Sequence, residues 1–174
     1  MLHPDDQRLS VVSLTDKLEE VADWVEEHSN GLYLSKIRGF QFKLRLFGLH
    51  FASLDIRQDS RVIQSALRSA LSAGGAQMSG FEDMSQSEQI EFLMSAELPN
   101  EVNGLGEERH QDVLESMRVM LRIQEQNGPR ACHRFIISNC RGMVDIAAVI
   151  GLARMAGVWQ KMQLDVVPLF ETIE

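Results

Sequence analysis

Three short apolar segments, widely separated in the chain, place the strongest limit on how this sequence can fold. They cover residues 49–56, 133–138 and 164–170 and contain many Ile, Val, Leu and Phe residues. The stretches between them show the three- and four-residue apolar repeat of amphipathic helices. Strands that alternate with long helices are joined by helical crossovers and run parallel. The sequence therefore predicts a helix-rich α/β fold with three parallel strands.

The helical pattern also predicts where the helices begin and end. It is clearest over residues 107–126, where we expect Met117 and Met120 to fill the core. Capping residues and helix breakers indicate further helices at 15–28, 32–47, 60–70, 85–93 and 143–156. Thr15 is the expected N-cap of the first of these, and Gly74-Gly75 the expected end of the third.

The composition limits the partners and the compartment of the chain. A net charge of −8 and a pI near 5.1 argue against nucleic-acid binding, which needs a basic face. A single phosphate group needs only one or two local arginines, so the acidity is compatible with a phosphorylated small molecule. No apolar run approaches the roughly 20 residues of a membrane span, and the amino end has no signal-peptide profile. We expect a cytoplasmic protein without a membrane partner.

Cysteine and histidine give no sign of a metal site. Cys132 and Cys140 flank a predicted strand, and in a reducing cytosol we expect free, buried thiols. Metal sites need more ligands at closer spacing. His50 and His133 lie at predicted strand starts, and we interpret both as structural. A glycine-rich phosphate loop and a nucleophile elbow are also absent from the sequence.

The candidate functional residues lie where predicted strands end. In parallel α/β folds, functional groups gather where strands give way to helices. Arg57, Ser138, Asn139 and Glu171 all occupy such positions.

Arg57 and Glu171 each have a functional and a structural interpretation. The planar fork of Arg57 suits a phosphate or carboxylate, and the alternative is an ion pair with Asp55, Asp59 or another nearby acid. Glu171 could supply one carboxylate ligand to a divalent cation such as Mg²⁺, and the alternative is a solvated residue. The sequence shows no obvious second metal ligand.

Three segments resemble one enzyme family, in the correct order. Residues 54–60 read Leu-Asp-Ile-Arg-Gln-Asp-Ser, which resembles the Leu/Ile-Asp-Ile-Arg-Gln-Glu-Ser segment of phosphoenolpyruvate carboxylases. Residues 135–138, followed by residues 144–149, look like a strand of that family and the helix after it. Residues 166–172 read Val-Val-Pro-Leu-Phe-Glu-Thr and resemble its Pro-Leu-Phe-Glu-Thr segment. The resemblance covers about residues 32–174, after a leading helical segment at 1–31.

The resemblance implies a fold, a reaction and residue roles. That family is largely helical, is built around an eight-stranded barrel and joins bicarbonate to phosphoenolpyruvate, giving oxaloacetate and phosphate with Mg²⁺ or Mn²⁺. The chain would then contain part of a TIM-like barrel. Arg57 would bind the substrate phosphate, and Glu171 would be one of two carboxylate metal ligands. The parent enzyme would be a homo-oligomer.

Several departures from the family pattern change what we expect of this chain alone. The segment with the catalytic histidine (Thr-Ala-His-Pro-Thr-Glu), the Gly-Arg-Gly-Gly loop and the second metal aspartate are missing. Asp59 replaces a usual Glu, and Ile63 stands where many members have His. We therefore expect an internal fragment of a larger enzyme that is inactive alone, binds the metal weakly and self-associates through exposed strand edges. The alternatives are a stand-alone helical interaction module and a small phosphate-binding α/β regulator.

Overall fold

The chain forms two compact units, which are described separately. The computed structural model describes residues 10–73, 80–100 and 102–171. The first unit ends at Ala52 and the second begins at Ser53. The helix that follows residue 31 packs with the first helix within the first unit.

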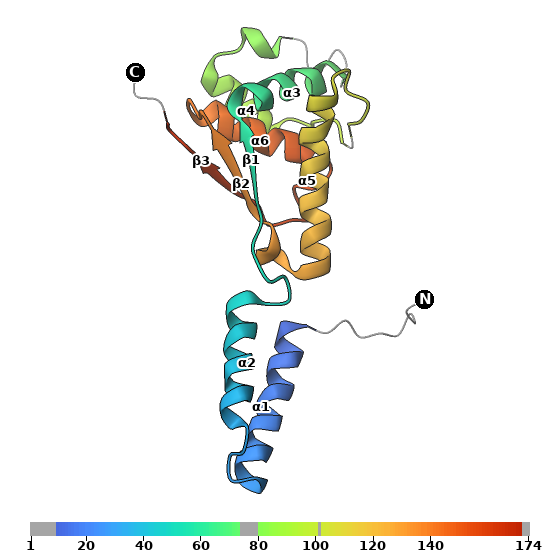
Figure 1. The fold of residues 1–174 in the computed structure, drawn as a ribbon. Coiled ribbons are helices and arrows are strands. Elements are labelled where there is room, and N and C mark those ends of the chain that lie inside the picture. Colours follow the sequence, from blue (N-terminus) through green and yellow to red (C-terminus); the bar gives the residue numbers. More distant parts are fainter. Residues whose placement is uncertain (1–9, 74–79, 101, 172–174) are drawn as a thin grey trace. The chain divides into compact units, whose positions relative to one another are not determined.

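The first unit is a hairpin of two helices, α1 (Val11–His28) and α2 (Leu34–Phe47), which lie side by side (Figure 1). The predicted N-cap at Thr15 was wrong, because Ser10 and Ser13 form a reciprocal capping box that starts α1 four residues earlier. The hydroxyl of Thr15 instead donates to the carbonyl of Val11 at 2.7 Å. Tyr33 has a φ of 68°, so α2 begins at Leu34 and not at Leu32.

The second unit contains one sheet and its crossover helices. In chain order its elements are β1 (Asp55–Asp59), α3 (Ser60–Ala73), η2 (Phe81–Asp83), α4 (Gln86–Ser95), α5 (Glu108–Asn127), η3 (Pro129–Ala131), β2 (Arg134–Ser138), α6 (Met143–Met155) and β3 (Asp165–Pro168). The three strands are parallel and lie in the order β1-β2-β3. The predicted helix-rich α/β fold with three parallel strands is confirmed. The expected helix end at Gly74-Gly75 lies outside the described residues.

The first strand lies further along the chain than the sequence suggested. The prediction was 49–56, but β1 covers Asp55–Asp59 and the preceding residues form turns. Gly48 and Phe51 have φ values of 58° and 64°, and positive φ is incompatible with a strand. The apolar residues before β1 misled the prediction because β1 is an edge strand with few apolar side chains of its own.

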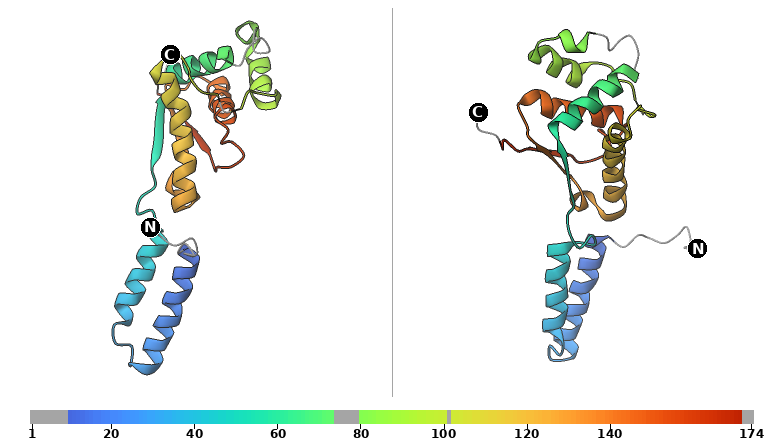
Figure 2. Two further views of the ribbon diagram at one scale, coloured as in Figure 1. Left: turned by 90° about the vertical axis from the view of Figure 1, so that its right-hand side faces the viewer. Right: turned by 45° about the horizontal axis from the view of Figure 1, so that its top comes forward.

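The sheet has one covered and one uncovered face. Phe135 and Ile137 of β2 are fully buried, whereas the alternating residues Arg134, Ile136 and Ser138 are only half-buried. Helices α5 and α6 lie on the Phe135 side of the sheet (Figures 1 and 2). Within the described part of this unit, no helix covers the opposite face. The register places Arg57 beside Ile136 on that uncovered face.

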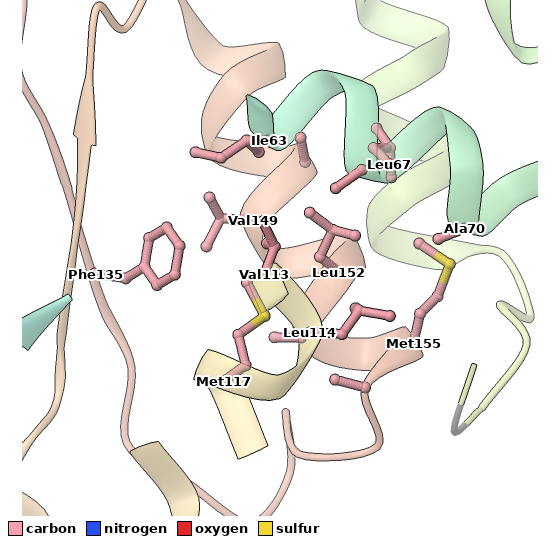
Figure 3. Close-up of a cluster of buried hydrophobic side chains, with 14 of the residues drawn as sticks. Ile63, Leu67, Ala70, Val113, Leu114, Met117, Phe135, Val149, Leu152 and Met155 are labelled. Carbon is pink, nitrogen blue, oxygen red and sulfur yellow. The ribbon is translucent and has the colours of Figure 1, made fainter. Parts of the chain in front are cut away.

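The core lies between the covered face and the helices (Figure 3). Its fully buried side chains come mainly from α3, α4, α5, β2 and α6, and include Ile63, Leu67, Leu93, Val113, Leu114, Met117, Phe135, Val149, Leu152 and Met155. Met117 and Met120 are both buried, as predicted. None of the described helices combines the length and the apolar character needed to cross a membrane.

Candidate functional site

Arg57 lies in the middle of β1, two residues before its end, and not at a strand exit as the sequence suggested. Its position differs from the prediction because β1 begins at Asp55, later than the predicted start at residue 49. Its side chain lies on the uncovered face and is 58% exposed. A cation on this face remains accessible to a ligand.

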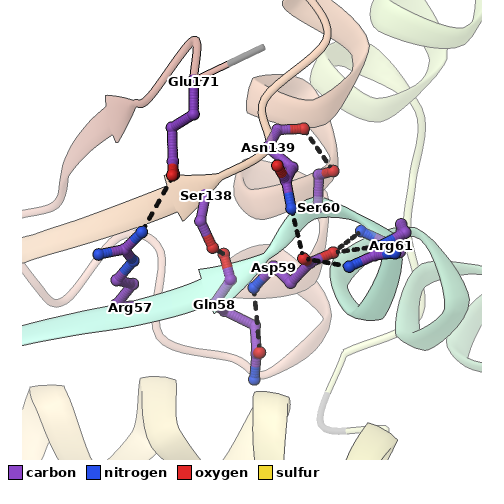
Figure 4. Close-up of polar contacts among 8 residues, drawn as sticks. All are labelled: Arg57, Gln58, Asp59, Ser60, Arg61, Ser138, Asn139 and Glu171. Carbon is purple, nitrogen blue, oxygen red and sulfur yellow. Dashed lines mark hydrogen bonds and ion pairs between the residues drawn. The ribbon is translucent and has the colours of Figure 1, made fainter.

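The structure brings Arg57 and Glu171 together. Nη2 of Arg57 donates to Oε1 of Glu171 at 3.0 Å, although the two residues are 114 positions apart (Figure 4). Glu171 follows β3 by three residues, and its side chain is 42% exposed. Arg57 and Glu171, which the sequence indicated as separate candidates, therefore form one site.

Backbone hydrogen bonds hold the segment that carries Glu171. The amide of Leu169 donates to the carbonyl of Ile137 at 2.8 Å, which extends the ladder beyond β3. The amide of Cys140 donates to the carbonyl of Leu169 at 3.0 Å. The chain after β2 thus fixes the chain after β3, two residues before Glu171.

The other acids near Arg57 have partners of their own. Asp55 forms an ion pair with Arg134 at 2.9 Å, at the opposite end of β1 from the strand exit. Asp59 forms a double contact with Arg61, whose Nε and Nη2 lie 2.9 and 2.8 Å from its two carboxylate oxygens. The acid that pairs with Arg57 is thus Glu171.

Asp59 is the centre of a hydrogen-bond network that the sequence did not predict. Besides Arg61, the side-chain amide of Asn139 donates to the Asp59 carboxylate at 2.8 Å (Figure 4). The Arg61 guanidinium, above all, holds the pKa of Asp59 well below its usual range, and Asn139 adds to this effect while burial opposes it. The Asp59–Asn139 bond links the exits of β1 and β2.

Ser138 and Asn139, nominated for their position at a strand exit, make structural contacts. The Ser138 hydroxyl donates to the carbonyl of Gln58 at 3.3 Å, and the Ser60 hydroxyl donates to the carbonyl of Asn139 at 2.7 Å. Asn139 has a φ of 53°, a left-handed conformation that Asn tolerates. An Asn directly after a buried strand was the available sequence signal for this turn.

The described residues offer a metal ion one candidate ligand at this site. Among residues 10–73, 80–100 and 102–171, no three His, Cys, Asp or Glu side chains lie together as a metal group. Cys132 and Cys140 are free and buried, as predicted, and burial raises the pKa of both thiols. Mg²⁺ uses only one or two carboxylates and completes its shell with water and substrate oxygens. Glu171 fits one such position.

Comparisons with known proteins agree on one family. The family model described as phosphoenolpyruvate carboxylase matches residues 2–174. A phosphoenolpyruvate carboxylase of Prochlorococcus marinus strain MIT 9215 is 30% identical over 156 residues, which are 84% of this chain and 16% of that protein. Those of Gloeobacter violaceus and Nitrosomonas eutropha are each 29% identical, over 76% and 86% of this chain. The chain therefore spans about one sixth of the length of these curated relatives.

Proposed function

Because the chain belongs to the phosphoenolpyruvate carboxylase family, we propose that it is part of an enzyme that carboxylates phosphoenolpyruvate. Bicarbonate would supply the carboxyl group, and oxaloacetate and phosphate would be the products. The observation that carries the proposal is the meeting of Arg57 and Glu171 on the uncovered face of the sheet.

Arg57 would bind the phosphate group of phosphoenolpyruvate. Its guanidinium is exposed and offers parallel donors that match phosphate oxygens. The mid-strand position supports this role, because a β-strand holds its side chains in a fixed direction while a loop would not.

Glu171 would supply one carboxylate to a divalent cation, Mg²⁺ or Mn²⁺. A bound cation of this kind stabilises negative charge that develops on substrate oxygens. Glu171 lies within 3.0 Å of Arg57, so the anion and the cation would bind side by side. With one carboxylate available, the chain alone would hold the metal weakly and would be catalytically inactive.

The one-sided sheet supports a partial TIM-like barrel. In such barrels helices cover the outside of parallel strands, and the inner face receives side chains from other strands. Here helices cover only the Phe135 face, while Arg57, Ile136 and Val167 share the uncovered face by register. We assign the uncovered face to a barrel interior and the free strand edges to pairing with further strands or with another chain.

The ion pair between Arg57 and Glu171 adds a constraint on binding. Each ligand needs one partner of the pair, so the first ligand to bind must open it, and the second meets a residue already released. The two ligands therefore help each other, by the same factor in either order. An exposed pair contributes about 0.2–1 kcal/mol, which sets this coupling at no more than about fivefold.

Calorimetry tests the site with phosphoenolpyruvate and Mn²⁺. We expect weak binding of phosphoenolpyruvate that Mn²⁺ strengthens, and an at least about tenfold loss in Arg57→Gln. Arg134→Gln is the matched control, because Arg134 shares the face of Arg57 and already pairs with Asp55. Equal affinity in Arg57→Gln and the unmodified chain would remove Arg57 from the site.

Two further measurements test the coupling between the two ligands and the expected inactivity of the isolated chain. In Glu171→Gln, Mn²⁺ should no longer strengthen phosphoenolpyruvate binding, whereas binding without metal should be retained or improved because Arg57 is released. Unchanged coupling would exclude Glu171 as the ligand. Formation of oxaloacetate by the isolated chain, abolished in Glu171→Gln, would show that the chain is active and contradict the expected inactivity.

A further inference from the structure

One peptide group joins the chain segments that follow the three strands. The carbonyl of Asn139 accepts a hydrogen bond from the Ser60 hydroxyl at 2.7 Å (Figure 4). The amide of Cys140, which belongs to the same peptide, donates to the carbonyl of Leu169 at 3.0 Å. The carbonyl and the amide of a trans peptide point in opposite directions within one plane. Because β2 is the central strand, this peptide connects the chain after β1 with the chain after β3.

Both contacts of this peptide lie close to the two site residues. Ser60 follows Arg57 by three residues, and Leu169 precedes Glu171 by two. Phe170 and Glu171 make no backbone hydrogen bond to another described residue. Leu169 is therefore the last residue before Glu171 that the backbone of the described chain holds in place.

The backbone conformation of Asn139 sets the direction of this peptide. Its φ of 53° is left-handed and turns the chain out of β2. Asn tolerates this conformation, whereas a β-branched residue strongly disfavours it. The side-chain amide of Asn139 also donates to Asp59 at 2.8 Å, which ties the turn to the end of β1. On the other side of the peptide, Ser60 is fully buried, so water does not compete for its contact.

We propose that Asn139 is a positioning residue for the site formed by Arg57 and Glu171. Its peptide, held between Ser60 and Leu169, keeps the two charged side chains 3.0 Å apart. The inference rests on the proposed function, because it gives the turn a part in placing the phosphate and the cation side by side. Asn139 acts through the backbone and not by contact with a ligand. Loss of its left-handed conformation turns the peptide, breaks the bond to Leu169 and releases Glu171 from Arg57.

Two substitutions at residue 139 separate the backbone from the side chain. Asn139→Val and Asn139→Gly both remove the amide that binds Asp59, but only glycine adopts the left-handed conformation readily. Hydrogen exchange of the full chain, measured by NMR without ligands, reports the state of the turn. We expect the Cys140 amide to exchange at least about tenfold faster in Asn139→Val than in Asn139→Gly. Equal exchange in the two variants would overturn the role of the backbone.

The NMR signal of the Arg57 guanidinium shows whether Glu171 still lies beside it. Glu171→Gln removes a charge 3.0 Å from the guanidinium, so it should shift the Nε–H resonance of Arg57 in the unmodified chain and in Asn139→Gly. In Asn139→Val we expect less than half of that shift, with the helices and the sheet retained by circular dichroism. An undiminished shift would contradict the positioning role. This measurement needs no substrate and is therefore independent of the proposed function.

Calorimetry with phosphoenolpyruvate and Mn²⁺ then tests the link to binding. In Asn139→Val, the strengthening of phosphoenolpyruvate binding by Mn²⁺ should fall from at most about fivefold to about onefold. Affinity without metal should stay within about twofold, because Arg57 remains in β1, and Asn139→Gly should restore the coupling. Full coupling in Asn139→Val would overturn the proposal. Absence of coupling in the unmodified chain would instead count against the proposed function, and the two NMR measurements would still decide the role of Asn139.

Ser60→Ala provides a second variant that leaves the φ of Asn139 unchanged. It removes the hydroxyl that holds the other end of the peptide. We expect faster exchange of the Cys140 amide and a smaller Arg57 shift, both between the values of the unmodified chain and of Asn139→Val. If Asn139→Val does not fold, Ser60→Ala decides the question, and unchanged exchange together with an unchanged shift would overturn the proposal.

Discussion

The two units of this chain differ in how many of their apolar side chains are buried. Among the described residues, the second unit buries twenty-seven apolar side chains, whereas the hairpin buries two. Of the fifteen large apolar residues that are exposed in the described chain, eleven belong to the hairpin. The α/β unit therefore has a core of its own, whereas the hairpin buries little apolar surface.

The helix sequences explain the difference. The buried residues of α3 include Ile63, Ala66, Leu67, Ala70 and Leu71, which follow the one-sided repeat of a helix that covers a sheet. In α2, by contrast, apolar residues occur toward α1 and on both flanks, as Leu44, Phe40 and Phe42 illustrate. A helix that is apolar on several sides is suited to burial within a bundle.

The largest expected effect comes from a substitution in the core of the α/β unit. Phe135 is fully buried, and we expect Phe135→Ala to lower the free energy of unfolding by about 3–5 kcal/mol. Phe42→Ala removes the same ring from the exposed hairpin surface and should change it by less than about 0.5 kcal/mol. Urea denaturation followed by circular dichroism measures both, and similar losses would contradict the contrast between the units.

The same contrast between the two units should hold for buried polar groups, with smaller losses in the free energy of unfolding. Asp145, only 3% exposed, accepts hydrogen bonds from Gln64 at 2.8 Å and the amide of Arg141 at 2.9 Å. Asp145→Ala should lower the free energy of unfolding by about 1–3 kcal/mol, because it leaves these donors without an acceptor.

Gln41 is the counterpart of Asp145 in the hairpin. It is equally buried, but its partner Glu19 is exposed and can turn to water. Gln41→Ala should therefore destabilise the chain less than Asp145→Ala in the same urea experiment. A larger loss in Gln41→Ala would show that the hairpin is the more tightly specified unit.

The smallest expected effect is the pH-dependent part of the stability that Asp59 contributes at the exit of β1. The pKa of Asp59 is lowered in the folded chain, so its contacts stabilise the protein above the unfolded value of about 3.9. This contribution is lost as the pH falls below about 4 towards the lower folded pKa. Asp59→Asn should be less stable than the unmodified chain at pH 7, and the difference should narrow between pH 5 and pH 3.

Removing the main partner of Asp59 provides the control. In an Arg61→Gln background, the pH-dependent part of the Asp59→Asn difference should shrink, since Arg61 is the main cause of the lowered pKa. A difference that stays constant from pH 7 to pH 3 in the unmodified background would contradict the role of the Asp59 charge.

Local patterns in the sequence were sufficient for the helices of the α/β unit. The helix predicted at 85–93 is present as α4, which begins with a capping box of Ser85 and Glu88, and α5 begins and ends within one residue of its predicted bounds. Helix caps and apolar repeats involve neighbours in the chain, so the sequence contains the information directly. β1 was misplaced because an edge strand with polar residues has no such local signature.

The sequence by itself determined that Arg57 and Glu171 were candidates, because each stands in a segment typical of one family. Only the tertiary structure decided that they meet, at 3.0 Å, and that Asp55 and Asp59 have other partners. That outcome depends on the parallel register of three strands and on the bond between Cys140 and Leu169. These contacts join residues far apart in the chain, and no local pattern of residues encodes them.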